Sequence, residues 1–363
     1  MDPAWPGAGP ALPMPVSDAV QRHTVGIAHV HGILQGARAR GMDIDAILRR
    51  AGIAPSLLAS PAARVAATQF AALNRTLRRL LRDELWGLCR LPVPPGTFVA
   101  LAGPLLQCRD ARGVLQDGLH RARLVLSDFA PRLRVDGDEA SIVLARREPR
   151  RHDPDFVGAA VMFYAVRTVS WLVGQPMPVR AIRFDYAAPG RARDTDRLFN
   201  APVQYDAPWL GLTLDAAWLD RPVVRTEAEW HALRRGMPAN LVLRYRNADS
   251  LFERVRGILR QAPAYPPPLS DLATALRVSP ATLRRHLARH GSSYRLALDA
   301  VRRDLAIDML VRRHADIAET AAALGFSESS TFQRAFKRWT GVAAGEYRRR
   351  GGGGRDAVRP PGA

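Results

Sequence analysis

The polar side chains with the clearest candidate chemistry lie near the C-terminal end of the chain. Phe332 and Phe336 are four residues apart, so both fall on one face of a helix. Amide, guanidinium and ammonium groups lie between or beside them, on Gln333, Arg334, Lys337 and Arg338. These groups donate hydrogen bonds to phosphate oxygens and to base edges. A short helix with an apolar inner face and a cationic outer face has the shape that the DNA major groove admits.

An earlier stretch, residues 269–291, repeats this pattern. Ser279 is a predicted helix cap, and Pro280 occupies the first helical position, where a missing N–H costs little. Leu283 and Leu287 are the expected inward anchors, and Arg284, Arg285 and Arg289 face out or flank them. The turns of the two units are 48 residues apart and their apolar anchors 49. One residue is therefore inserted early in the second outer helix.

Two short helices joined by a tight turn are expected to position the second unit. Asp316 and Glu319 form a capping-box-like start. Gly325 lies where the first helix must stop, because glycine adopts a left-handed conformation without steric penalty. Ser327 is the predicted cap of the second helix.

Between the two units, residues 297–313 predict one continuous helix of roughly 25 Å. Its expected inward residues are Leu298, Val301, Leu305, Met309 and Leu310. This length suits two helices held about one DNA turn apart, roughly 34 Å, on one face of the duplex.

The run A-L-G-F-S-E-S-S-T-F-Q-R-A-F-K-R-W-T-G, residues 323–341, closely resembles the C-terminal signature of AraC-type transcriptional regulators. The resemblance covers roughly residues 250–348. It implies an all-α domain with two helix-turn-helix motifs, joined by the linking helix, that enter successive major grooves.

By position, the resemblance implies two sets of DNA contacts. The base-reading residues are Ala281, Arg284, Arg285, Ser329, Ser330, Gln333 and Arg334. The predicted phosphate contacts are Arg289, Arg295, Lys337 and Arg338. Arginine can hydrogen-bond to guanine and glutamine to adenine. Alanine can only contact a thymine methyl or leave space for the base. A solvated helix face is the competing interpretation for Arg284 and Arg334.

Three positions depart from the family pattern. Arg277 stands where glycine is usual, which predicts a turn strained by about 1–2 kcal/mol. Thr320 replaces a branched apolar residue, and a mild loss of packing is expected. Ala344 replaces a common proline, which puts the start of the final helix in doubt.

The chain has 363 residues and a formal charge of +19. Residues 253–350 carry 18 basic and 9 acidic side chains, so positive charge is over twice as dense there as before them. This favours an anionic partner such as promoter DNA, although a solvated surface explains charge alone equally well. Lys337 is the one lysine, and a genome rich in G and C explains most of the arginine bias. Two cysteines, no secretory signal and no long apolar stretch indicate a reducing cytoplasm without a membrane.

The rest of the chain predicts an α+β sensor domain. We expect helices near 22–40, 43–52, 62–85, 111–126, 153–172, 193–199 and 226–245, a hairpin over 132–144 with its turn at Asp136-Gly137, strands near 179–186, 203–205 and 210–214, and a loop over 91–104. This pattern resembles the arabinose-binding-like N-terminal domain of one AraC-type subgroup, a resemblance that names no ligand. The predicted domains are a disordered arm over 1–17, a sensing and dimerisation domain over 18–245, the DNA-binding domain over 246–350 and a flexible tail over 351–363. Met1 and Met14 are both candidate start residues.

Competing chemistries have weaker support. His23, His29 and His31 are six and two residues apart, so one helix face does not present all three to a metal. Five tryptophans, at 86, 171, 209, 218 and 230, fit a core better than a pocket. No nucleophile elbow, zinc motif or phosphate loop occurs, so no cofactor or catalytic residue is expected.

We therefore predict a ligand-responsive transcription activator that is not an enzyme, with RNA polymerase and a homodimer partner implied by the resemblance. The alternatives are an enzyme domain tethered to DNA and a non-specific nucleoid protein.

Overall fold

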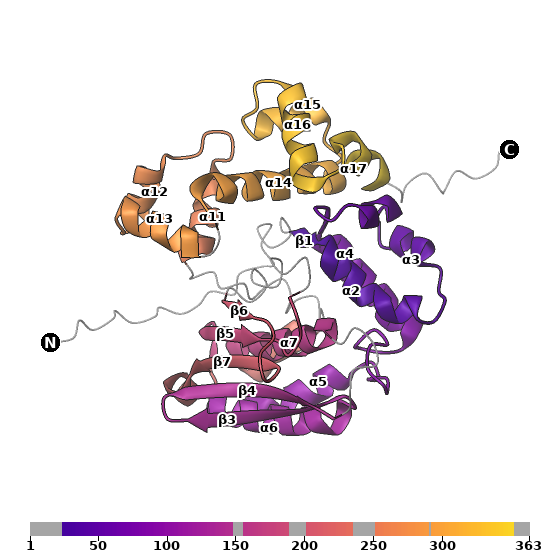
Figure 1. Cartoon of the computed structure of the whole chain (residues 1–363), viewed down its shortest axis with the longest axis vertical. Coiled ribbons are helices and arrows are strands. Elements are labelled where there is room, and N and C mark those ends of the chain that lie inside the picture. The colour runs from indigo at the N-terminus through magenta and orange to yellow at the C-terminus, as the bar shows by residue number, and fades with distance from the viewer. Residues whose placement is uncertain (1–23, 148–154, 189–200, 235–250, 290–291, 352–363) are drawn as a thin grey trace.

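A computed structural model describes residues 24–147, 155–188, 201–234, 251–289 and 292–351. The predicted arm over 1–17, the helix near 193–199 and the linker over 244–250 lie outside these residues. The described chain forms a sheet unit, a pair of upright helices and a helical C-terminal unit (Figure 1). This arrangement is the predicted combination of an α+β N-terminal part with an all-α C-terminal part.

The sheet unit holds a five-stranded sheet of order β3-β4-β7-β5-β6, antiparallel except between β5 and β6. Its strands are β3 (Phe129–Asp136), β4 (Glu139–Arg146), β5 (Val179–Arg183), β6 (Val203–Gln204) and β7 (Gly211–Asp215). The β3–β4 hairpin confirms the prediction, with Asp136 paired to Glu139. Gly137 and Asp138 form its turn, one residue later than expected.

Helices cover the sheet, with α6 packed on β3 and α7 on β7. The helical segments of this unit are α5 (Thr97–Ala102), η2 (Gly103–Gln107), α6 (Ala111–Val125), α7 (Asp155–Val173), η3 (Ala216–Asp220) and α9 (Glu227–Arg234). The loop predicted over 91–104 is wrong at α5. The carboxylate of Glu84 accepts the backbone N–H groups of Gly96 and Phe98 at 2.8 and 2.7 Å. A distant carboxylate therefore caps this helix.

Among the described residues, α7 is the one helix long and apolar enough to cross a membrane by length and composition. Its window Phe156–Val173 has a mean hydropathy of 1.6, and 67% of that window is buried inside the protein. Since α7 contacts α2, α6 and β7, it has the surroundings of a core helix. Trp86, Trp171, Trp218 and Trp230 are also buried, as a core role predicts.

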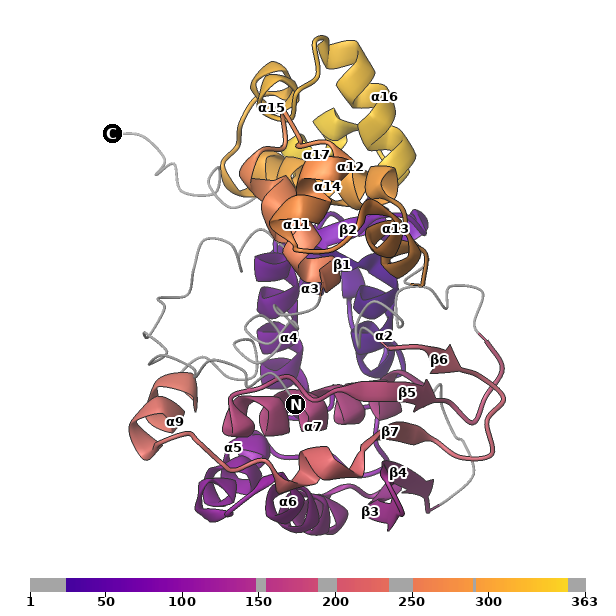
Figure 2. The same cartoon turned by 90° about the vertical axis from the view of Figure 1, so that its left-hand side faces the viewer.

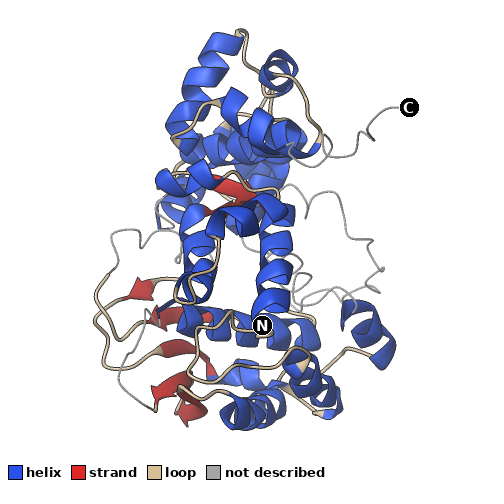
Figure 3. Ribbon diagram, turned by 90° about the vertical axis from the view of Figure 1, so that its right-hand side faces the viewer, coloured by secondary structure: helices blue, strands red, loops and turns tan. Residues whose placement is uncertain are grey.

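Two upright helices, α2 (Ile27–Arg38) and α4 (Ala67–Leu81), stand between the sheet unit and the C-terminal unit (Figures 2 and 3). The short helices α3 (Ile44–Arg50) and η1 (Pro55–Ala59) connect them. A two-stranded sheet of β1 (Thr24–Gly26) and β2 (Arg64–Ala66) joins their upper ends, where continuous helix is predicted. The sequence pattern missed these strands because each has three residues, too few to display an alternation.

The C-terminal unit is all helical, as predicted. Its helices are α11 (Leu251–Gln261), α12 (Leu269–Ala275), α13 (Pro280–Arg289), α14 (Tyr294–Arg312), α15 (Ile317–Ala323), α16 (Ser329–Thr340) and α17 (Ala344–Gly351). The final helix starts at Ala344, so the missing proline does not prevent it. Thr320 is fully buried, and its hydroxyl donates to the Asp316 carbonyl at 2.7 Å, which satisfies the polar group.

The two tight turns differ in backbone strain. Arg277 has φ +57° in the turn before α13, a left-handed conformation that confirms the expected strain. Gly325 has φ +77° in the turn before α16. A Cβ at Gly325 would lie 2.3 Å from the carbonyl oxygen of Ala264, so only glycine fits there.

The substitution Arg277→Gly is expected to raise the free energy of unfolding by about 0.5–1 kcal/mol, since relief of the left-handed strain exceeds the entropy of glycine. Gly325→Ala is expected to lower it by at least about 1–2 kcal/mol, because strain and the Ala264 overlap add. Urea unfolding followed by circular dichroism measures both. A destabilised Arg277→Gly variant would contradict the strain assignment.

Candidate nucleic-acid interface

The two predicted reading helices lie on the same side of the linking helix. In Figure 2, α13 and α16 both lie to the right of α14. The linking helix α14 has 19 residues and spans roughly 28 Å, slightly longer than predicted. The helices α13 and α16 begin at Pro280 and Ser329, 49 residues apart, which places the inserted residue ahead of α16.

The predicted apolar anchors are buried in both motifs. Leu283, Leu287, Phe332 and Phe336 are at most 1% exposed. The anchors orient each helix, because the inward face is fixed by its contacts with the core. The opposite faces of α13 and α16 therefore point to solvent.

The predicted DNA contacts mostly lie on these solvent faces. Ala281, Arg284, Arg285, Arg295, Ser330, Gln333, Arg334, Lys337 and Arg338 are exposed, and Ser329 is half-buried. The side chain of Arg289 lies outside the described residues. Arg334 donates to the Thr331 hydroxyl at 3.0 Å, which holds its guanidinium over the helix surface. Arg338 approaches Asp299 of α14 at 3.7 Å.

Helix caps agree with the prediction at two of three positions. The Asp316 carboxylate accepts from the Glu319 N–H at 2.6 Å, and the Ser279 hydroxyl accepts from the Thr282 N–H at 3.1 Å. The predicted Ser327 cap is wrong, because the cap residue of α16 is Glu328, whose side chain makes no capping bond. The inserted residue moves the helix start past Ser327.

Three aromatic or basic contacts that hold the second motif were not foreseen. Phe326 meets the rings of Phe332 and Trp339, with centroids 5.6 and 6.0 Å apart. Arg302 of α14 lies 5.3 Å over the Phe326 ring. The family-like run contains these rings, but the Arg302 contact joins residues 24 positions apart and has no local signal.

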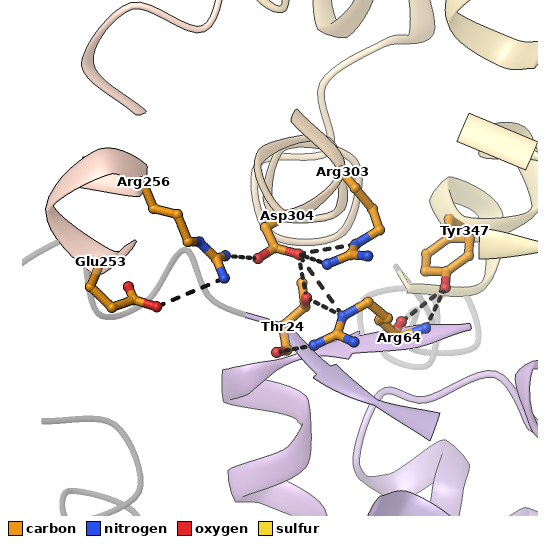
Figure 4. A network of polar contacts seen from close by, with 7 residues as sticks. All are labelled: Thr24, Arg64, Glu253, Arg256, Arg303, Asp304 and Tyr347. Atoms are coloured by element: carbon orange, nitrogen blue, oxygen red, sulfur yellow. Dashed lines mark hydrogen bonds and ion pairs between the residues drawn. The ribbon is translucent and has the colours of Figure 1, made fainter. Parts of the chain in front are cut away.

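A buried ion cluster attaches the C-terminal unit to the upright helices (Figure 4). Asp304 of α14 is 2% exposed. Its carboxylate accepts from Arg256 of α11 at 2.8 Å, from its neighbour Arg303 at 3.0 Å and from the Thr24 hydroxyl at 2.6 Å. Arg64 lies 4.0 Å away and donates to the same hydroxyl at 2.7 Å. We call Thr24, Arg64, Arg256, Arg303 and Asp304 the Asp304 cluster.

The charges of this cluster control the ionisation of its carboxylate. Burial opposes a charged carboxylate, but the guanidinium groups of Arg303, Arg256 and Arg64 and the Thr24 hydrogen bond outweigh it. They hold the pKa of Asp304 well below its ordinary range. Asp304 is therefore ionised throughout the physiological pH range.

Further hydrogen bonds extend this contact between the two units. The Tyr347 hydroxyl accepts from the Arg64 N–H at 3.0 Å and donates to the Arg64 carbonyl at 2.9 Å. The Ser60 hydroxyl donates to the Thr340 carbonyl at 2.9 Å. The end of α16 and the start of α17 are thus bonded to the segment before α4.

Other chemistries receive no support from the described residues. No group of three or more metal-ligating side chains occurs among them, and His23 lies outside. Cys89 is buried and Cys108 half-buried, both as free thiols.

Two family models match separate parts of this chain. Residues 41–223 match a family model described as the arabinose-binding domain of AraC transcription regulator, and residues 272–350 match a helix-turn-helix domain model. The ornithine utilization regulator of Pseudomonas aeruginosa is 27% identical over 327 residues, which cover 89% of this chain and 96% of that protein. The urease operon transcriptional activator of Escherichia coli is 31% identical over 96 residues, covering 26% and 32%. The solved regulator CdpR from Pseudomonas aeruginosa aligns at 22% identity and a TM-score of 0.31, over 89% of this chain and 97% of that one.

Asp304→Asn is expected to lower the free energy of unfolding by about 3 kcal/mol or more, because it leaves buried arginines without their counter-charge. Denaturant unfolding of the full chain at pH 7 measures this. Asp299→Asn is the matched control on the same helix, and its exposed, loose pair with Arg338 should be worth less than about 1 kcal/mol. Equal effects of the two changes would contradict the role of the cluster.

The stability contributed by Asp304 depends on pH in one direction. Because its folded pKa is depressed, the contribution is present above the unfolded pKa of about 3.9 and is lost as pH falls through the lower folded pKa. The difference in unfolding free energy between the wild type and Asp304→Asn should stay constant from about pH 7 to pH 5 and shrink below about pH 4. A difference that grew on acidification would contradict this sign.

Proposed function

The chain belongs to the family of AraC transcription regulators and is a sequence-specific DNA-binding regulator, and on that premise we propose that α13 and α16 read two successive major grooves of one promoter. The observation that carries this proposal is the pair of exposed cationic helix faces on one side of α14 (Figure 2). A linking helix of roughly 28 Å supports a separation near one DNA turn, roughly 34 Å.

We assign base contacts to Ala281, Arg284, Arg285, Ser329, Ser330, Gln333 and Arg334. The arginines offer two parallel N–H donors to guanine, and Gln333 offers a donor and an acceptor to adenine. Arg289, Arg295, Lys337 and Arg338 are assigned to phosphates, which set the register without reading the sequence. Ser329 is half-buried, so it reaches only a base that comes close to the helix start.

We propose that residues 18–245 sense a small molecule and support a homodimer, that residues 246–350 bind DNA, and that residues 1–17 and 351–363 are accessory ends. The regulator acts as an activator through RNA polymerase in the cytoplasm, on the nucleoid. Two relatives whose names describe a utilization regulator and an operon activator support the regulatory role. Their names do not transfer a ligand to this chain.

The Asp304 cluster is the proposed route between sensing and DNA binding. A ligand alters DNA affinity only when it binds two states of the protein differently. The cluster joins the strands at the ends of α2 and α4 to α14, the helix that spaces the two motifs. A shift of α4 therefore moves α14 and changes the spacing of α13 and α16.

Arg284→Ala and Arg334→Ala are each expected to cost about 1–3 kcal/mol of binding to the selected DNA site and to relax specificity in separate half-sites. Selection from a random duplex library followed by competition binding measures both quantities. Arg75→Ala, an exposed arginine on α4, is the control and should leave binding unchanged. Uniform weakening on all sequences would overturn the base-reading role, and equal affinity for selected and random duplexes would favour a nucleoid protein.

Lys337→Ala is expected to weaken binding evenly across sequences and to reduce the slope of log affinity against log salt by about one charge. Titrations between about 50 and 200 mM salt measure the slope. An unchanged salt slope together with altered base preference would place Lys337 at a base edge instead.

A further inference from the structure

An apolar pocket of about 150 Å³ lies in the sheet unit, at the end of α4 away from the DNA-binding motifs. It opens between the loop after α4 and the helices α5, α6 and α7. Aliphatic side chains form most of its wall, including Leu101, Leu105, Leu115, Leu119, Val161 and Val169. Protein interiors are packed as densely as organic crystals, so a pocket of this size that opens from the core offers room for a small ligand.

The charged side chains in the pocket wall are Arg78 and Glu84, and they form an ion pair with each other. The Glu84 carboxylate also accepts the N–H groups of Gly96 and Phe98 at 2.8 and 2.7 Å. Its oxygens are therefore already committed, which leaves little for a ligand ammonium group. A ligand carboxylate would place a second anion beside Glu84, an arrangement that like-charge repulsion disfavours.

One donor in this wall remains unused. The Nε–H of Arg78 is buried and has no hydrogen-bond partner among the described residues. Buried polar groups are satisfied in nearly all native proteins, so this donor is available to an acceptor that enters the pocket.

The volume sets the size of the occupant. An apolar cavity of about 150 Å³ in another protein binds benzene, so one six-membered ring with a small substituent suits this space. The side chains that line the pocket therefore favour an uncharged ligand with one hydrogen-bond acceptor. A free amino acid, which carries both an ammonium and a carboxylate group, does not meet these conditions.

We propose that this pocket is the effector site of the regulator and takes a small, uncharged, largely apolar molecule whose single acceptor oxygen bonds to Arg78. The proposal rests on the ligand-responsive role argued above and names the ligand class for it. The helix α4 carries the signal. Arg78 lies near one end of α4, and Arg64 of the Asp304 cluster lies three residues before its other end. A ligand that fixes Arg78 changes the position of α4 and so the contact of Arg64 with α14.

The test uses the full chain and three probes of similar size: acetophenone, ethylbenzene and benzoate. Titration calorimetry is expected to give saturable binding of acetophenone, about tenfold weaker binding of ethylbenzene because it lacks the acceptor, and no measurable binding of benzoate. Binding of benzoate as tight as that of acetophenone, or no binding of any probe, would overturn the proposal.

Variants locate the site. Ala122→Phe fills the pocket and should weaken acetophenone binding at least tenfold, whereas Leu124→Phe adds the same ring on the exposed side of α6 and should leave binding unchanged. The double variant Arg78→Met with Glu84→Gln removes the donor without leaving an unpaired charge. It should bind acetophenone and ethylbenzene within about twofold of each other. Equal loss in Ala122→Phe and Leu124→Phe would place the probe elsewhere.

The final measurement links the pocket to DNA. Acetophenone should change the affinity for the selected duplex several-fold in the wild type and not in Ala122→Phe. Selective DNA binding that acetophenone does not alter, despite occupying the pocket, would overturn the effector role while leaving the DNA-binding function intact. Absence of selective DNA binding in every sample would instead defeat the proposed function itself.

Discussion

A buried carboxylate sets the relation between the two halves of this protein. An ionised Asp304 inside the molecule is costly to desolvate, and the cost is offset only when cationic and hydroxyl donors surround it. The surrounding groups come from four elements of the chain: β1, β2, α11 and α14. The fold must bring these elements together to satisfy one charge, so the contact has a defined geometry that apolar packing alone would leave looser.

The geometry of that contact gives α4 two functions. At its start, β2 places Arg64 near Asp304, and near its other end Arg78 pairs with Glu84 beside the apolar pocket. A helix of 15 residues transmits displacement along its axis with little loss, because its backbone bonds are internal. The upright pair α2 and α4 in Figure 3 is therefore the proposed link between the pocket and the DNA-binding unit as well as part of the core.

Local sequence patterns were enough to predict much of the C-terminal unit. The spacing of Leu283 and Leu287, and of Phe332 and Phe336, determined which faces are buried, since helix periodicity repeats within a few residues. Long-range partners had no such signal: Asp304 resembles any exposed carboxylate on a helix until Thr24, 280 positions away, is placed beside it. The capping of α5 by Glu84, 12 positions before Gly96, was missed because the sequence does not show which residue lies beside that helix start. The strands β1 and β2 were missed because three residues are too few to show an alternation. The DNA contacts remain predictions, since the described residues establish their exposure and not their partners.

The charge of the C-terminal unit also needs the structure for its interpretation. Basic side chains are dense there, but Arg256 and Arg303 face Asp304, and Arg312 and Arg313 lie 3.2 and 3.5 Å from Asp308. Asp304 and Asp308 offset part of the charge of these four arginines, so the four contribute less to an outward field than fully exposed, unpaired arginines would. Among the described residues of this unit, ten arginine and lysine side chains are exposed, and half of them lie on α13 and α16: Arg284, Arg285, Arg334, Lys337 and Arg338. A count of charges per residue therefore overstates the charge that attracts DNA. The charge on the exposed faces of α13 and α16 points in one direction, as recognition of one side of a duplex requires.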